Sequence, residues 1–416
     1  MSATVRLADS GWLRAPALAR ALSLLNSGGE EARVVGGAAR NALMGLPLSD
    51  IDIATTALPD EVVRRAAAGG LKVKPTGIDH GTVTLVVDGA PFEVTTLRQD
   101  VETFGRKAKV AFGRDWKADA ERRDFTMNAL SISADGVVHD YVDGLADLEA
   151  RRVRFIGDPA RRIAEDYLRI LRFFRFQASY AHGAPDPAGL HACIVARDGL
   201  RGLSRERVRA ELMKLLVAPF AVPTLAVMTE AGFATLLLGG VALLASFANM
   251  IKVEEAAGVA PDAVRRLGAL GVFVDEDAER LRDKLRLFNS ESERLASMAS
   301  RWWRVSPALG EAGAQVLLYR LGPERYVDRV LIAWTRAPQG ASDPAWHSLV
   351  ALPMRWTAPR FPLKSADLIG RGVPKGPALG AAMRAAEEAW IAAGIPHDET
   401  SLDRLANDAA RRVTVL

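Results

Sequence analysis

The chain of 416 residues contains one cysteine, Cys193, so it cannot form an internal disulfide. A lone thiol is typical of proteins from a reducing compartment. The sequence also lacks a long apolar run, because the most apolar stretch, 236–250, is interrupted by glycines and is too short to cross a bilayer. Its first residues lack the basic-then-apolar pattern of a signal peptide. These absences predict a cytoplasmic protein without a membrane segment.

Low-complexity blocks and repeats of fixed period are also missing, and 49% of the residues are hydrophobic. Such a chain is expected to be globular throughout and long enough for several compact units. An excess of one charge is lacking as well, since the net charge is only +4. The isoelectric point of 9.3 nevertheless favours an anionic partner, and arginines concentrate in 151–175 and 201–209.

The first 150 residues alternate short apolar runs with turn signals, which is typical of strands. Asp88 and Gly89 separate two such runs and predict a hairpin. Two helical stretches, Ala38–Met44 and Pro59–Ala68, interrupt the runs. We therefore expect a small mixed α/β domain. Its predicted strands are Ala32–Val35, Ile51–Ala54, Gly81–Val87, Pro91–Leu97, Ala129–Ser133 and Val137–Tyr141.

From about residue 158 onward the strand patterns nearly vanish. Asp158 and Pro159 suit a helix start, and apolar residues then recur at helical spacing up to Phe174. Linker-like composition separates later helices at Ala337–Asp343 and Trp356–Lys364. The predicted fold class is therefore α+β, with a mixed β-sheet domain followed by helices only. Further helices are expected at 187–196, 204–217, 222–232, 260–270, 275–287, 290–303, 311–320 and 325–336, and two or three more in 365–413.

A glycine pair, Gly36-Gly37, precedes Arg40, and two carboxylates, Asp50 and Asp52, follow it. Glycines at a helix start let backbone N–H groups approach a phosphate, and the helix adds its positive end. Residues i and i+2 of a strand share a face, so the two carboxylates can hold Mg²⁺ in a two-metal arrangement. A surface Asp-x-Asp beside an ordinary turn is the alternative interpretation.

Two arginine-containing segments predict further ligand contacts. Arg123 lies next to local hydrogen-bonding residues that suit a structured turn, which would hold it rigidly enough to bind a phosphate. Asp166 and Arg169 stand three residues apart and are neighbours on one face of the predicted helix. Arg172 follows, and Arg175 lies about 180° away from Asp166 on an ideal helix. The alternatives are a solvated helix end and a surface ion pair.

These segments resemble the motifs of class II tRNA nucleotidyltransferases, the CCA-adding enzyme family, over residues 33–217. A later stretch, 363–380, is similar to the family's C-terminal tail. The order and spacing of five motifs are highly specific. They are Gly36-Gly37-x-x-Arg40 with Asp50-Ile51-Asp52, Arg122-Arg123-Asp124-Phe125-Thr126-x-Asn128-Ala129, Asp140-Tyr141-x-x-Gly144-x-x-Asp147-Leu148, Glu165-Asp166-x-x-Arg169-x-x-Arg172, and Leu203-Ser204-x-Glu206-Arg207-x-x-x-Glu211-x-x-Lys214-Leu215-Leu216.

The resemblance implies a nucleotidyltransferase head at 1–150, a neck at 151–220, a body at 221–340 and a tRNA-binding tail at 341–416. It implies Mg²⁺, CTP and ATP, and a tRNA 3′ end as acceptor. Asp50 and Asp52 would hold the metal. The residues that would bind nucleotide are Gly36, Gly37, Arg40, Arg123, Asp166, Arg169, Arg172 and Arg175.

Asp166 and Arg169 would read the base, which would make the protein its own template. Cytosine and adenine both present an amino donor beside a ring-nitrogen acceptor, and a carboxylate with a guanidinium matches that order. Uracil and guanine present the reverse order, and each mispaired group costs about 1–3 kcal/mol.

The sequence departs from the family pattern at Ala39 and Asn41, where a β-branched residue and an aspartate are usual. Neither change removes a metal ligand or the phosphate-binding arginine. Glu93 is a candidate third carboxylate, although an outward-facing strand acid is an equal alternative. Other functional hypotheses are a poly(A) polymerase, a partial CC- or A-adding enzyme, and a catalytically inactive RNA-binding protein. A long segment at 98–120 favours addition of the complete CCA.

Overall fold

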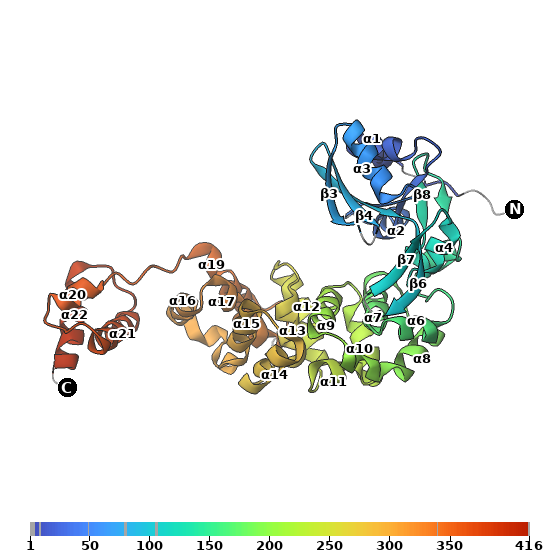
Figure 1. Ribbon diagram of the computed structural model, residues 1–416. Coiled ribbons are helices and arrows are strands. Elements are labelled where there is room, and N and C mark those ends of the chain that lie inside the picture. The colour runs from blue at the N-terminus through green and yellow to red at the C-terminus, as the bar shows by residue number, and fades with distance from the viewer. Residues whose placement is uncertain are drawn as a thin grey trace. The chain divides into compact units, whose positions relative to one another are not determined.

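The computed structural model describes residues 5–7, 10–48, 50–78, 81–104, 107–338 and 340–414. The chain forms two compact units (Figure 1). The first comprises 1–240 with 284–286, and the second comprises 241–283 with 287–416. The predicted division into four domains stays a prediction. No described helix is both long and apolar enough to span a membrane.

A seven-stranded sheet forms the centre of the N-terminal part of the first unit. Only the β2–β5 pair is parallel, and the other neighbours in this sheet are antiparallel. Every predicted strand has a counterpart, with ends that differ by one or two residues. The strand order is β3 (Lys72–Gly77), β4 (Thr82–Val87), β5 (Ala90–Thr96), β2 (Asp52–Thr55), β1 (Ala32–Val35), β8 (Ser131–Ser133) and β9 (Val138–His139).

Helices α1 (Pro16–Leu25) and α3 (Pro59–Ala68) cover one face of this sheet (Figure 1). Leu22 and Val62 on the helices pack with Val34 and Leu85 on the strands in one apolar core. Alternation explains the packing, because β4 buries every second side chain against the helices. Helix α2 (Gly36–Leu43) adds Ala38 and Ala39 to this same core, whereas Val35, Ala54 and Leu97 form a separate small apolar cluster with Trp116.

Sequence reasoning missed several elements of the first unit. Strand β3 and helix α1 were not predicted, and the segment after β5 forms a separate two-stranded sheet, β6 (Arg98–Phe104) with β7 (Lys107–Phe112). The β6 sequence is mostly polar and carries no clear apolar alternation, so only backbone pairing identifies it.

The predicted continuous helix from Asp158 to Phe174 is wrong. The structure has two helices, α6 (Pro159–Glu165) and α7 (Leu168–Tyr180), separated by an extended Asp166 with φ −157° and ψ 109°. The Asp166 carboxylate accepts a hydrogen bond from the Leu168 amide at 3.1 Å. A short acidic side chain that accepts a hydrogen bond from the backbone two residues later competes with helix continuation at its own position, which explains the break.

The rest of the first unit is helical, as predicted for the chain beyond the sheet. Buried aromatic residues Phe125, Phe155 and Phe173 stack at the junction between the sheet domain and α7. The remaining helices are α4 (Trp116–Glu121), α5 (Gly144–Glu149), α8 (Pro187–Val195), α9 (Arg205–Leu216), α10 (Ala221–Glu230) and α11 (Phe233–Leu238).

The second unit consists of helices and includes α12, which the sequence pattern did not predict. A buried ion cluster joins three of its helices: Asp328 binds Arg265 at 2.9 Å and Arg294 at 2.7 Å. Both predicted linkers separate helices. The helices are α12 (Leu244–Ala256), α13 (Ala263–Gly271), α14 (Asp275–Leu285), α15 (Asn289–Ala299), α16 (Gly310–Leu321), α17 (Pro323–Thr335), α18 (Pro344–Val350), α19 (Leu352–Arg355), α20 (Ser365–Ile369), α21 (Pro377–Ala392) and α22 (Glu399–Thr414).

Candidate active site

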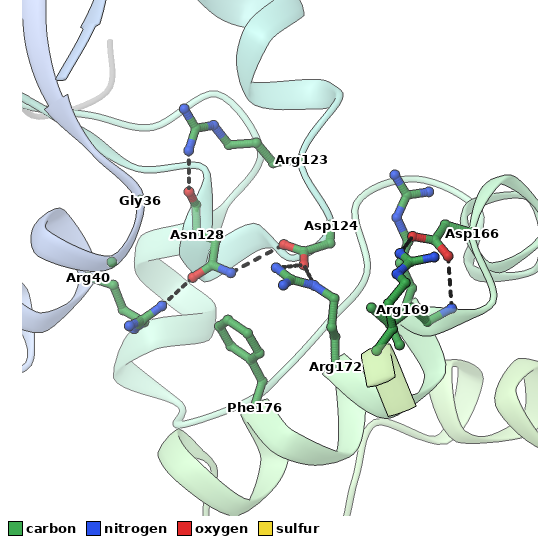
Figure 2. A pocket seen from close by; sticks show the side chains of 12 residues that line it. Gly36, Arg40, Arg123, Asp124, Asn128, Asp166, Arg169, Arg172 and Phe176 are labelled. Carbon is green, nitrogen blue, oxygen red and sulfur yellow. Dashed lines mark hydrogen bonds and ion pairs between the residues drawn. The ribbon is translucent and has the colours of Figure 1, made fainter. Parts of the chain in front are cut away.

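One cavity of about 520 Å³ in the first unit gathers residues from the sheet domain and from helices α7 and α9 (Figure 2). Most of its polar lining carries positive charge, which suits a polyanionic ligand. Its walls include most of the residues predicted to bind nucleotide. Its lining residues are Gly36, Gly37, Arg40, Arg123, Asp124, Asn128, Asp166, Leu168, Arg169, Arg172, Phe176 and Arg207.

The glycine pair lies where β1 ends and α2 begins. Gly36 has a φ of +65°, in the region that side chains other than glycine rarely adopt. A Cβ atom on Gly36 would lie 3.4 Å from Nη1 of Arg123, and one on Gly37 would lie 3.6 Å from Nη2 of Arg40. The bare backbone therefore leaves the N-terminus of α2 open between two guanidinium groups, which is a favourable position for phosphate oxygens.

Arg40 is buried and forms part of the cavity wall. Its guanidinium donates to Oδ1 of Asn128 and, at 2.7 Å, to the hydroxyl of Tyr180, whose ring it also covers at 3.9 Å. It donates to the side chain of Asn41 as well. Burial lowers the pKa of Arg40, yet an arginine retains its charge at neutral pH. These neutral partners fix the cation without neutralising it.

Arg123 is held by Asp119 of α4, which accepts a hydrogen bond from its Nη2 at 3.1 Å. Its other terminal nitrogen donates to the Asn128 carbonyl at 3.4 Å. Burial raises the pKa of Asp119, but Arg123 and Arg122 more than offset this and keep it below its ordinary value. The predicted rigid placement of Arg123 agrees with these contacts.

A hydrogen-bonded chain connects the sheet domain to α7 (Figure 2). Asn128, which binds Arg40, donates to Oδ1 of Asp124 at 3.2 Å, and Nε of Arg172 donates to Oδ2 of Asp124 at 2.6 Å. Burial raises the pKa of Asp124, but Arg172 outweighs it and holds the pKa below its ordinary value. Arg172 is thereby placed in the cavity wall with part of its charge neutralised.

Asp52 begins β2, and Asp50 lies two residues before it; neither lines the cavity above. Asp52 pairs in parallel register with Glu93 of β5, so the carboxylates of these neighbours leave the same face of the sheet. Burial, then Glu93 and Asp50, raise the pKa of Asp52, with Arg123 acting in the opposite direction. Crowded oxygen ligands of this kind fit Mg²⁺, which commonly takes one or two carboxylates and completes its shell with substrate phosphates.

Within the described residues, no group of three or more His, Cys, Asp or Glu side chains is arranged to bind a metal ion. The carboxylates of Asp52 on β2 and Glu93 on β5 therefore need further oxygen ligands from a substrate or water. The same-face argument for Asp50 is also weaker than the sequence suggested, because Asp50 lies in a bend before the strand.

Asp166 and Arg169 both line the cavity, but they are not paired with each other. Oδ2 of Asp166 binds Nη2 of Arg207 at 2.5 Å, and Arg169 binds Glu165 and the carbonyl of Arg162. Burial raises the pKa of Glu165, but Arg169 and Arg162 hold it below its ordinary value. The prediction that both residues lie on one helix is wrong, because α6 ends before Asp166 and α7 begins after it.

Arg175 is not among the lining residues, and its Nε binds Glu211 of α9 at 2.5 Å. Sequence reasoning assigned no ligand contact to Asn128, Phe176 or Arg207, which do line the cavity. Asn128 and Arg207 occur within the second and fifth motifs, so the sequence pattern included both residues but assigned them no function. Phe176 had no such signal, because an apolar residue at helical spacing reads as core.

The comparisons with known proteins cover most of the chain. Residues 32–154 match the family "Poly A polymerase head domain", and residues 186–243 match the family "Probable RNA and SrmB- binding site of polymerase A". The mitochondrial CCA tRNA nucleotidyltransferase 1 of Danio rerio is 35% identical over 371 residues, which cover 86% of this chain and 83% of that protein. The chain belongs to the CCA tRNA nucleotidyltransferase family.

Other relatives and solved structures agree with this membership. The CCA-adding enzyme of Limosilactobacillus fermentum is 30% identical, with 93% of this chain and 95% of that protein covered. The crystal structure of the Bacillus stearothermophilus CCA-adding enzyme, in complex with CTP, has a TM-score of 0.75 and 25% identity, covering 95% of this chain and 98% of the other. The Thermotoga maritima enzyme shares the fold at a TM-score of 0.66 and 19% identity, over 98% and 100% of the two chains.

The expected α+β fold class and the expected enzyme class, a CCA tRNA nucleotidyltransferase acting on tRNA, are therefore confirmed. The relatives from Danio rerio and Homo sapiens are both named mitochondrial enzymes. The cytoplasmic location consequently stays a prediction from the sequence.

Proposed function

We propose that this CCA tRNA nucleotidyltransferase adds the complete CCA sequence to the tRNA 3′ end from CTP and ATP, using the cavity of Figure 2 as its nucleotide site. The observation that carries the proposal is the placement of Gly36, Arg40 and Arg123 in one cavity with Asp166 and Arg169. The first group suits a triphosphate, and the second suits the edge of a base.

The reaction joins the terminal 3′-oxygen of tRNA to the α-phosphorus of the nucleotide. The bond between that phosphorus and the pyrophosphate oxygen breaks, and the hydroxyl proton leaves to solvent or a base. Mg²⁺ bound by Asp50 and Asp52, with Glu93 as a further candidate, would supply charge stabilisation for this transfer. Arg40 and Arg123 orient the triphosphate and offset the charge that develops on the departing pyrophosphate.

Base selection rests on Asp166 as an acceptor and Arg169 as a donor. This order suits cytosine and adenine and mismatches uracil and guanine. Arg169 is bound to Glu165, so it has to exchange that partner for the base, whereas Asp166 keeps acceptor capacity beside Arg207. Arg172, held by Asp124, borders the same space. Arg175 lies outside the lining, where it binds Glu211 and covers the ring of the lining residue Phe176 at 4.4 Å.

A direct assay tests the proposal. The protein is incubated with tRNA that ends at the discriminator base, with CTP alone, ATP alone and both, and the 3′ ends are sequenced. We expect CC with CTP alone and CCA with both nucleotides. A product that stops at CC with both nucleotides present, a single A or a long A tail would support the partial or poly(A) activities instead. No product would contradict the proposal.

A further inference from the structure

Asp166 is anchored from two sides, and each anchor occupies a different carboxylate oxygen. Oδ1 accepts from the Leu168 amide at 3.1 Å, and Oδ2 accepts from Nη2 of Arg207 at 2.5 Å. The backbone at Asp166 is extended between two helices, so its side chain leaves the chain where α6 has ended and α7 has not begun. The carboxylate plane is thus fixed by one local contact and one contact from a distant helix.

Arg207 reaches the cavity from the first turn of α9, 41 residues further along the chain. Its side chain and that of Asp166 are 22% and 25% exposed, so the pair borders the cavity while most of it is withdrawn from water. Among the described residues, the Arg207 guanidinium donates its hydrogen bond to the carboxylate of Asp166. Arg207 therefore faces the Asp166 carboxylate, whereas Arg169 binds Glu165.

We propose that Arg207 is a positioning residue for nucleotide selection: it orients the Asp166 carboxylate so that a free lone pair faces the base. The proposal rests on the base-reading role of Asp166 given above. An ionised carboxylate can accept hydrogen bonds but cannot donate them. A carboxylate fixed in this way accepts an amino group of cytosine or adenine and opposes a carbonyl of uracil or guanine.

Removing the distant anchor frees the carboxylate to rotate while the local anchor remains. Selection should then weaken, because a mobile carboxylate can turn away from an opposing carbonyl at little cost. Addition of the correct nucleotide should fall less than discrimination falls, since the correct hydrogen bond can still form in part of the population. A residue with a purely structural role would instead lower the rates for all nucleotides by one factor.

The experiment compares wild type, Arg207→Ala, Arg207→Met and Arg207→Lys on tRNA ending in CC. The quantities measured are kcat and KM for ATP and for the competing GTP and UTP. Arg207→Met keeps the length of the side chain and protects its packing. We expect the ratio of kcat/KM for ATP to that for GTP to fall roughly tenfold or more in the Ala and Met variants, as for loss of one charge-assisted hydrogen bond. Arg207→Lys should restore part of the ratio.

Arg205→Ala is the matched control, because it removes a positive charge from the same helix at an exposed position outside the cavity. It should leave the ratio unchanged. The ratio is independent of the folded fraction of each preparation. Equal losses for all nucleotides in Arg207→Ala, or an unchanged ratio, would overturn the proposal.

Asp166→Ala and the double variant Asp166→Ala/Arg207→Ala separate this proposal from the one it rests on. If Arg207 acts through Asp166, the double variant discriminates no worse than Asp166→Ala alone. If Asp166→Ala itself keeps full discrimination, the base-reading role fails and the Arg207 proposal fails with it. If Asp166→Ala loses discrimination and Arg207→Ala does not, only the role of Arg207 is refuted.

Discussion

At the candidate phosphate-binding end of the cavity, the missing side chain of Gly36 matters as much as the positive charge of Arg40. Gly36 adopts a φ of +65° beside Arg123, and no side chain blocks the start of α2. Arg40 binds the side chains of Asn128, Tyr180 and Asn41, which carry no carboxylate. The departure from the family pattern at Asn41 therefore gives Arg40 a neutral partner at this position and leaves its charge uncompensated there.

Asp52→Ala should abolish nucleotide incorporation while tRNA binding remains nearly intact. The physical reason is that the proposed Mg²⁺ site loses an oxygen ligand where Asp52 of β2 lies in register with Glu93 of β5. The measurement pairs incorporation of labelled CTP with tRNA binding on filters. Asp60→Ala, an acidic residue in the first turn of α3, serves as the control. Retained turnover in Asp52→Ala would refute the metal assignment.

Arg169→Ala should relax selection against UTP and GTP. Each mispaired polar group in the wild-type site costs about 1–3 kcal/mol, so removal of the guanidinium should reduce discrimination roughly tenfold. Competition between CTP and UTP on tRNA that lacks CCA measures the effect. Arg161→Ala, which removes an exposed arginine of the preceding helix, is the comparison. Identical discrimination in Arg169→Ala and wild type would argue against base reading by this residue.

At the scale of elements, the break between α6 and α7 decides how the site is assembled. One continuous helix would place Asp166 and Arg169 on neighbouring positions of one face. Because Asp166 instead lies between α6 and α7, its carboxylate accepts from the Leu168 amide and binds Arg207 of α9, while Arg169 binds Glu165 of α6. A residue 41 positions away thus supplies the partner of Asp166, whereas the partner of Arg169 lies only four positions before it.

The contact between Asp124 and Arg172 links the sheet domain to α7 and should depend on pH in a defined direction. The pKa of Asp124 is lower in the folded protein than its ordinary value of about 3.9. Its contribution to the free energy of unfolding is therefore complete above that value and is lost as the pH falls through the folded pKa. The contact should be worth about 1.5–3 kcal/mol at neutral pH.

Urea unfolding of wild type and Asp124→Asn tests this expectation. The difference in unfolding free energy should be constant from pH 5 to 7 and should shrink below about pH 4. Asp60→Asn, at an exposed position, should give no such pH-dependent difference. A difference in unfolding free energy that stays constant below about pH 4 as well would contradict the role of the Asp124 charge.

For the whole molecule, the two compact units divide the work that the family resemblance implies. The first unit holds the sheet, the cavity and the residues around Asp52. The second consists of helices, and its last helices contact α16 through Tyr319 with Glu387 and through Arg320 with Glu388 at 2.6 Å. The residues that line the cavity therefore all belong to the first unit.

Removal of residues 363–416 should weaken tRNA affinity more than CTP affinity. The cavity lies within the first unit, whereas the tail is the part expected to bind tRNA. Filter binding with tRNA and equilibrium binding of CTP measure the two effects. A full-length Arg320→Ala variant controls for loss of the contact with α21 alone. A larger loss of CTP affinity than of tRNA affinity would count against a tRNA-binding tail.

The sequence by itself predicted six of the seven strands of the central sheet and the candidate site residues, but not β3. Strand alternation and turn signals are local, so β1, β4 and β5 follow from their own residues. Chemical type and spacing also predicted the candidate phosphate-binding residues, of which Gly36, Gly37, Arg40 and Arg123 line one cavity. Elements without a local signal, such as β6 and β7, required backbone pairing to be recognised.

Only the tertiary structure decided which charged groups face one another. The pairing of Asp166 with Arg207 depends on a helix break and on the packing of α7 against α9, and neither follows from the spacing of residues 165–176. The same holds for Asp52 and Glu93, which the parallel register of β2 and β5 brings side by side. Hydrophobic and turn patterns act over a few residues, whereas an ion pair depends on distances set by the whole packed unit.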